Sequence, residues 1–308
     1  MEAKALRKQM EVTALKPPLS FRLRTGLTPY LFILPKLIVW VVFMLVPVIW
    51  TVAMTFQGGA ILKGLHFVGL ENYRKILSDD LFLKGLKNSF YYSVLVIPLV
   101  IILAVFMAAL LNQHIRLRPL WRASLIVPSV TTVIAAGVIW GYLLHTDVGL
   151  FNNMLQALGL NKINWLGRAN LVMPIFVFIE CWRSLGFYTI MFLAAMQSIP
   201  QHLYDAAAID GATGLQAFRI VTLPLMRPVL LFAMVMATIW NLQIFDTPYM
   251  MTKGGPGYAS TTTVIYIYKM AFTWDNMGGA TTAAFFLLLI ILALTALQLT
   301  FFRKEIQF

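Results

Sequence analysis

Ionisable side chains are rare inside the long apolar stretches of this 308-residue sequence. Glu180 and Arg183 lie three residues apart in one stretch, Lys36 lies in another, and Asp246 stands near the end of a third. Charged groups are costly to bury in an apolar environment, so they usually pair or line a polar path. Residues three apart share a helix face, and we therefore expect Glu180 and Arg183 to pair with each other. Lys36 is expected to reach toward lipid headgroups and is assigned no function.

Sequence motifs for nucleotide binding, metal binding and nucleophilic catalysis are absent. The sequence has no G-x-x-x-x-G-K-[ST] phosphate loop and no G-x-S-x-G nucleophile turn. Its four histidines are scattered, without an H-E-x-x-H motif or a Cys/His cluster. We therefore predict no catalytic residue, no metal site and no cofactor held by this chain. An enzyme acting inside a membrane would need several converging acids and bases, so the few ionisable groups favour a solute path.

Composition indicates the elements that must position these residues. Hydrophobic residues make up 60% of the sequence and charged residues 12%, and the mean hydropathy is +0.79. A helix needs about 20 apolar residues to cross a bilayer, and only a helix or a closed barrel satisfies its backbone hydrogen bonds there. No block alternates with the period of a barrel strand. We predict an all-α polytopic membrane protein with six transmembrane helices, at 29–56, 88–111, 123–144, 170–197, 229–250 and 279–302.

The distribution of basic residues predicts the orientation of the chain. Six spans place both termini on one side, and the segments on that side hold thirteen Lys and Arg residues against nine on the other. This bias favours cytoplasmic termini. The net charge of +12 is therefore a signal of topology and of a lipid surface, and no basic stripe indicates nucleic acid. The first span exceeds the apolar core of a cleaved signal, and the single cysteine, Cys181, excludes an intramolecular disulfide.

A polar segment between the fourth and fifth spans has the pattern of two short helices. The alanine-rich stretch Tyr204–Ile209 favours a helix, and Gly211 is suited to end it with a sharp turn. Thr213 with Gln216 three residues on predicts a capping box for a second helix. Helical spacing places Leu215, Phe218 and Thr222 on one face of this second helix. We expect Leu223-Pro224 to end it. Such a hairpin could dock on another protein or rest on lipid, and the residues alone leave both open.

The segment resembles the EAA loop of ABC-importer permeases, which reads E-A-A, a glycine four residues on, and then I-x-L-P. Asp205-Ala206-Ala207 with Gly211 resembles the first part, and Val221-Thr222-Leu223-Pro224 resembles the second. Asp205 replaces the usual glutamate, which keeps the carboxylate on a shorter arm, and Val221 replaces isoleucine. In this family the loop inserts into a separate ATPase subunit. The resemblance assigns ATPase coupling to Tyr204, Asp205, Ala206, Ala207, Asp210, Gly211, Leu223 and Pro224.

Three further stretches resemble the carbohydrate-uptake group of these importers, and within it the first permease of maltose and glycerol-phosphate systems. They are FVGLENYRKIL at 67–77, GFYTIMFLAAMQSIP at 186–200 and FDTPYMMTKGGPGYASTTTVIYIYKMAF at 245–272. The resemblance runs from about Thr28 to Phe302. It implies a cytoplasmic tail at 1–28 and a permease domain at 29–302, with the coupling loop at 198–228. A second cytoplasmic tail follows at 303–308.

The resemblance also implies an assembly and a cargo. The chain would form half of a pathway in a bacterial or archaeal cell membrane, with a second homologous permease, two ATP-binding subunits and an extracytoplasmic solute-binding protein. ATP and Mg would bind to the ATPase subunits, and the solute would be a sugar or sugar-like. A permease for a non-sugar solute, or an integral-membrane enzyme or scaffold, remains an alternative. By resemblance, the family's pathway positions fall on or near Leu185, Gly186, Thr189 and Asn241, and more loosely on Ser129 and Trp240. The polar residues Gln243 and Asp246 of the fifth span are added to these candidates for their chemistry.

The chemistry of the fifth span is compatible with a sugar path. Aromatic rings pack against the C–H faces of sugars, and amides bond their hydroxyls, so Trp240, Asn241 and Gln243 are suitable types. Helix packing through polar side chains would use the same residues.

Two further expectations concern other parts of the chain. Gly137 and Gly141 form a G-x-x-x-G pair, which predicts close helix contact. Glu71–Leu77 should form an amphipathic external helix, either packed on the bundle or offered to a binding protein.

Overall fold

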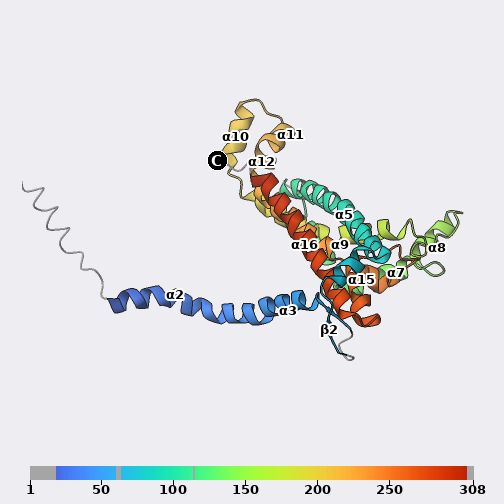
Figure 1. The fold of residues 1–308 in the computed structure, drawn as a ribbon. Helices are drawn as coiled ribbons and strands as arrows, with labels where there is room; N and C mark the ends of the chain where they lie inside the picture. Colours follow the sequence, from blue (N-terminus) through green and yellow to red (C-terminus); the bar gives the residue numbers. More distant parts are fainter. Residues whose placement is uncertain (1–18, 60–63, 114, 304–308) are drawn as a thin grey trace, which may run out of the picture. The chain divides into compact units, whose positions relative to one another are not determined.

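A computed structural model describes residues 19–59, 64–113 and 115–303, which form two compact units divided between Ala53 and Met54. Helices make up most of the described chain (Figure 1). Its described strands are a two-residue pair, β1 (Gln57–Gly58) antiparallel to β2 (His66–Phe67). The predicted all-α class is therefore confirmed. Most of the predicted N-terminal tail and all but one residue of the C-terminal tail lie outside the described residues.

The first unit contains the first apolar span. Its helices are α2 (Leu19–Trp40) and α3 (Val46–Met54), joined by a π-helical segment at Val41–Leu45. The stretch Tyr30–Met54 is long and apolar enough to cross a membrane, as predicted. Pro47 follows the π-helical segment by two residues. A proline cannot donate a backbone hydrogen bond, and the wider π turn adapts the helix before this missing donor.

The core of the second unit is built around two long helices, α5 (Asp80–Asn112) and α9 (Val172–Gln197), which pack along each other. Asp79 caps α5, because its carboxylate accepts hydrogen bonds from the backbone N–H of Leu81 at 2.8 Å and Phe82 at 3.1 Å. Fully buried residues recur every fourth position along one face of α5. The last two of them are alanines, and such small side chains let helices approach closely in a membrane. This face consists of Val96, Val100, Ala104 and Ala108.

The third predicted span is broken into α6 (Arg118–Val130) and α7 (Val133–Leu143), which meet at 96°. The predicted apolar span over 123–144 is therefore present as two helices with a sharp bend between them. The break has local causes: Pro128 lacks a donor in the last turn of α6, and the Thr132 side chain caps α7 by accepting from Ala135 N at 3.3 Å. The predicted G-x-x-x-G contact is only half present. A Cβ on Gly137 would meet α14 side chains, whereas Gly141 has no such neighbour within 4 Å.

The fifth predicted span is interrupted as well. Helix α13 (Arg227–Leu242) ends before Gln243, and α14 (Asp246–Thr252) begins after a three-residue gap. The predicted span is confirmed, because Arg227–Thr252 is long and apolar enough to cross a membrane, but its helix is broken at 243–245. The gap is held from outside the span, because the Thr262 hydroxyl donates to the free Ile244 carbonyl at 2.8 Å. Helices α15 (Thr263–Tyr268), a π-helical segment at Lys269–Thr273 and α16 (Met277–Arg303) complete the unit.

The hydroxyl-rich run Ser260–Thr263, with no exposed surface, braces the bundle from within. Ser260 Oγ donates to Gly255 O at 2.6 Å, and Thr261 Oγ1 donates to Gly254 O at 3.0 Å. Thr263 N donates to Ser89 Oγ in α5 at 2.9 Å. The T-K-G-G-P region therefore ties the α14–α15 connection to α5, which gives this diagnostic stretch a structural role.

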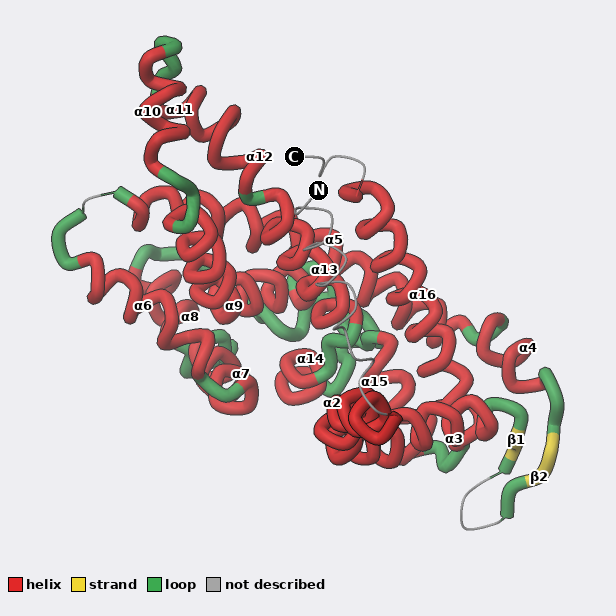
Figure 2. Tube along the Cα trace, turned by 90° about the vertical axis from the view of Figure 1, so that its left-hand side faces the viewer, coloured by secondary structure: helices red, strands yellow, loops and turns green. Residues whose placement is uncertain are grey.

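The predicted external helix is α4 (Glu71–Leu77), and it packs on the bundle against α16 (Figure 2). Lys75 and Glu71 form an exposed ion pair at 2.7 Å, one helical turn apart. The neighbouring Asn72 is buried, and its amide donates to the carbonyls of Thr55 and Gln57, both at 2.8 Å. These two bonds anchor the helix, so it is part of the fold and not a free appendage.

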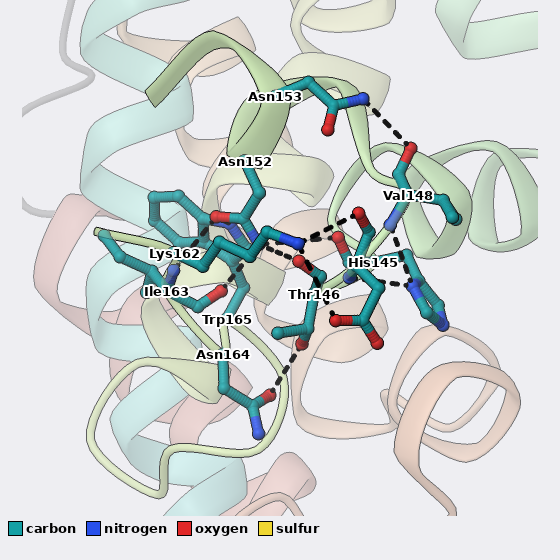
Figure 3. Close-up of polar contacts among 10 residues, drawn as sticks. His145, Thr146, Val148, Asn152, Asn153, Lys162, Ile163, Asn164 and Trp165 are labelled. Atoms are coloured by element: carbon teal, nitrogen blue, oxygen red, sulfur yellow. Dashed lines mark hydrogen bonds and ion pairs between the residues drawn. The ribbon is translucent and has the colours of Figure 1, made fainter. Parts of the chain in front are cut away.

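A second polar anchor organises the segment around α8 (Leu150–Ala157), shown in Figure 3. The side chain of Asn152 is fully buried and uses both ends of its amide. Its Nδ2 donates to the carbonyls of Thr146 and Ile163, both at 2.9 Å, and its Oδ1 accepts from Ile163 N and Trp165 Nε1. One asparagine thus joins both flanks of α8, because a buried amide must satisfy its polar atoms.

Candidate functional site

The polar segment predicted between the fourth and fifth spans folds as a helical hairpin that projects from one end of the bundle (Figure 2). Its first helix, α10 (Gln201–Ile209), ends at Gly211, whose φ is +80°. Gly211 N donates to Ala208 O at 3.0 Å, and Ala212 N donates to Ala207 O at 2.9 Å. These two bonds define a Schellman motif, which needs a left-handed residue at the position of Gly211. The predicted helix stop is confirmed.

The second helix of the hairpin, α11 (Gly214–Ala217), starts at the predicted capping box. Gln216 N donates to Thr213 Oγ1 at 3.4 Å, and Thr213 N donates to Gln216 Oε1 at 2.7 Å. The helix continues through a π-helical segment at Phe218–Thr222 into α12 (Leu223–Leu225). The helix therefore ends at Leu225, one residue beyond the predicted end at Leu223-Pro224. The π turn lies two residues before the proline, as it does at Pro47, and accommodates the missing donor.

Contacts across the hairpin fix its shape. The hydroxyls of Tyr204 and Thr222 lie 2.9 Å apart, Ala207 is buried, and Phe218 packs against the main core. Leu215 was expected on the same face as Phe218, and its side chain is exposed. Apolar side chains therefore gather on the outside of the hairpin. They are Ile209, which is 87% exposed, Leu215 and Ile220.

The acids of the hairpin are available to a partner. Asp205 accepts a hydrogen bond from Gln201 Nε2 at 3.2 Å, and Asp210 caps the end of α10. Both side chains are exposed. Within the part of the chain that the structure describes, neither carboxylate forms an ion pair. The eight residues predicted for coupling thus lie on one hairpin, where Tyr204 and Ala207 hold the fold and the acids face outward.

A polar cavity of about 280 Å³ lies where α13 ends. Four of the predicted pathway residues line it, namely Trp240, Asn241, Gln243 and Asp246. The gap after Leu242 brings them together, because it turns the chain and places Asp246 at the start of a new helix. Trp240 is half exposed and its ring lies 5.7 Å from that of Phe187. This geometry offers an aromatic face beside amide and carboxylate groups.

Glu180 and Arg183 of α9 also line this cavity. Arg183 Nη2 donates to Glu180 Oε1 at 2.7 Å and Arg183 Nε donates to Glu180 Oε2 at 3.0 Å, so the predicted pair is confirmed as a two-point contact. Only 14% of the Glu180 side chain and 27% of the Arg183 side chain are exposed. Their place in the cavity was missed, because the spacing of three residues predicts pairing but not the direction in which the pair faces.

A second cavity, of about 660 Å³ and mainly apolar, lies beside the first and shares Glu180, Arg183 and Trp240 with it. Ser129 of α6 lines this second cavity. Its hydroxyl donates to Arg183 O at 2.7 Å and accepts from Phe187 N at 3.2 Å, which joins α6 to α9. The ion pair and Trp240 therefore stand at the boundary between the two cavities.

The remaining predicted pathway residues line neither cavity. Gly186 allows α6 to approach α9, because a Cβ there would overlap the Leu125 backbone. Thr189 is fully buried, and Leu185 packs against the main core. The structure thus brings Ser129 and the four residues of the fifth span to the cavities, whereas these three residues of α9 pack between helices. Their assignment to a solute pathway stays a prediction.

Multiple spans, a projecting helical hairpin and an internal polar cavity define a multi-pass membrane transport component. Within the described residues, no three His, Cys, Asp or Glu side chains come together as a group that could hold a metal. Residues 82–306 match the family model described as "Binding-protein-dependent transport system inner membrane component". The chain belongs to this family, which confirms the resemblance of the EAA-like segment.

Relatives and solved structures agree with this assignment. The chain is 37% identical to the trehalose/maltose transport system permease protein MalF of Thermococcus litoralis. The alignment spans 251 residues and covers 81% of this chain and 83% of the relative. It is 33% identical to the probable ABC transporter permease protein YurN of Bacillus subtilis, over 89% and 96% of the two chains. A solved bacterial ABC transporter that imports the acidic polysaccharide alginate shares the fold, with a TM-score of 0.83, 23% identity, and coverage of 93% and 100%.

Proposed function

We propose that this chain is the membrane permease subunit of an ATP-driven, binding-protein-dependent importer for a sugar or sugar-like solute. The family assignment and relatives named as sugar permeases support this function. The observation that carries the mechanism is the direct connection between hairpin and cavity. The hairpin leads through α12 and one turn into α13, whose far end bears Trp240 and Asn241.

Helix α13 is the element that transmits movement in this proposal. Its 16 residues span about 24 Å, because an α-helix rises about 1.5 Å per residue. A displacement of the hairpin by an ATP-binding subunit would therefore move the lining of the cavity as a rigid-body shift. The tie between Tyr204 and Thr222 makes α10 move with this unit. The chain would thus convert closure of the ATPase into alternating access without binding ATP itself.

The hairpin has the surface expected of a docking element. Ile209, Leu215 and Ile220 supply exposed apolar side chains, while Asp205 and Asp210 add exposed carboxylates. Apolar anchors surrounded by polar groups are typical of protein interfaces. The partner in the proposal is one of two ATP-binding subunits, which hold ATP and Mg. In this proposal the hairpin and both termini lie in the cytoplasm of a bacterial or archaeal cell.

The cavity has groups suited to a sugar. Trp240 presents an aromatic ring to C–H faces, and Asn241, Gln243 and the ion pair offer hydrogen-bonding groups to hydroxyls. This chain forms one half of the path, and a second homologous permease completes it. An extracytoplasmic solute-binding protein delivers the solute to the outer end of that path.

Purification tests the division of labour between subunits. We expect the chain purified alone to show no ATP hydrolysis above that of membranes lacking it, and the chain expressed with its operon to copurify with an ATP-binding subunit. The control is an untagged chain taken through the same steps. Specific ATP hydrolysis by the isolated chain, or purification from the operon without any ATP-binding subunit, would overturn the proposal.

A further inference from the structure

Two acids and one arginine line the polar cavity, and their charges do not balance. Glu180 and Arg183 neutralise each other through a two-point ion pair. Asp246 also lines the cavity, and none of the ion pairs among the described residues includes it. With both carboxylates ionised and Arg183 protonated, these three groups leave the cavity with one excess negative charge.

The position of Asp246 is fixed by the fold. It is the first residue of α14, directly after the gap that the Thr262 hydroxyl stabilises at Ile244. Helix α7 packs against α14 and contributes Val133 to the cavity, and α5 contributes Tyr92. Neither of these side chains carries a positive charge. The Asp246 carboxylate lies at a partly enclosed cavity, where its electrostatic effect on a solute is stronger than in bulk water.

We propose that the unbalanced carboxylate of Asp246 makes this half of the path select neutral sugars over anionic ones, such as sugars that carry a carboxylate, sulfonate or phosphate. The inference rests on the proposed function and names the charge class of its solute. An anionic group beside Asp246 would be repelled, whereas a neutral sugar would use the same carboxylate as a hydrogen-bond acceptor. The fold itself does not set this preference, since the alginate importer of the same fold carries an acidic polysaccharide.

Uptake by the complete complex in proteoliposomes tests the proposal. The paired probes are a neutral oligosaccharide that the system imports and the same oligosaccharide with its terminal C6 oxidised to a carboxylate, at equal occupancy of the binding protein. We expect the wild type to favour the neutral probe. Asp246→Asn should raise the anionic-to-neutral uptake ratio about tenfold, equivalent to ~1.4 kcal/mol. Asp246→Lys should raise it further, and Asp246→Glu should retain the wild-type ratio.

A matched control removes an acid outside the cavity. Asp147 lies in an exposed pair with Lys162 at 3.8 Å, and Asp147→Asn should leave the ratio unchanged. Equal uptake of both probes by the wild type would overturn the charge selection while the proposed sugar import stands. An Asp246→Asn ratio equal to that of Asp147→Asn would do the same. Failure of the wild-type complex to import any sugar of either charge would overturn the proposed function itself.

Discussion

Gly211→Val is expected to reduce solute uptake to background while the chain still inserts into the membrane and assembles. Gly211 has a φ of +80° and closes the Schellman motif at the end of α10. A β-branched residue in that conformation carries about 1–3 kcal/mol of strain. A side chain there would meet no other atom within 4 Å, so the effect comes from the backbone alone. The turn would relax and misplace the hairpin against the ATP-binding subunit.

Asparagine at the same position separates backbone strain from loss of a small residue. It tolerates the left-handed conformation far better than valine, so Gly211→Asn should keep most of the uptake. The measurement compares uptake with binding-protein-stimulated ATP hydrolysis in proteoliposomes, after the amount of assembled complex has been matched. Wild-type uptake by Gly211→Val would show that the turn does not need its left-handed residue for coupling.

Trp240→Ala is expected to lower uptake by up to about tenfold without loss of assembly. The ring lines both cavities and is half exposed, so its removal leaves no void in the core. An aromatic platform contributes about 0.5–1.5 kcal/mol beyond its area, which corresponds to a fold-change of that size. Stimulated ATP hydrolysis should persist, because the hairpin is unchanged. Trp240→Phe should restore part of the uptake.

A matched control for Trp240 lies on the same helix. Phe232 is also about half exposed, but it lines neither cavity, so Phe232→Ala should leave uptake near the wild-type level. If Trp240→Ala instead prevents assembly, the indole is a packing residue. If both variants lose uptake equally, the cavity at the end of α13 is not the solute path.

Much of the coupling hairpin could be predicted because its signals are local. The capping box of Thr213 and Gln216 and the helix stop at Gly211 depend on residues a few positions apart, and both are confirmed. The same holds for the charge pair of Glu180 and Arg183. Local sequence patterns did not predict the π-helical segment at Phe218–Thr222 in the second helix of the hairpin, because no propensity rule distinguishes it from an α-helix.

The breaks in the third and fifth spans could not be predicted from hydropathy, since the apolar residues continue across them. The gap after Leu242 is stabilised by a hydroxyl from residue 262, which is distant in sequence. The cavity depends on that gap, because Asp246 would otherwise lie one helical turn beyond Leu242 on a continuous helix. Composition therefore predicts the number and approximate place of the spans. Pro128 and the Thr132 cap set the bend in the third span, whereas a long-range hydrogen bond stabilises the gap in the fifth.

Site-specific crosslinking tests most directly whether the hairpin docks on an ATP-binding subunit. Cys181 is buried and is the only cysteine, so Cys181→Ala provides a background for single new cysteines. Ile209→Cys places a thiol on the hairpin, and Leu158→Cys places one at an equally exposed position beyond α8. Each is labelled with a maleimide photo-crosslinker in membranes that contain the whole complex. The account predicts that Ile209→Cys captures an ATP-binding subunit and Leu158→Cys does not. No such product from Ile209→Cys, or equal capture from both positions, would contradict it.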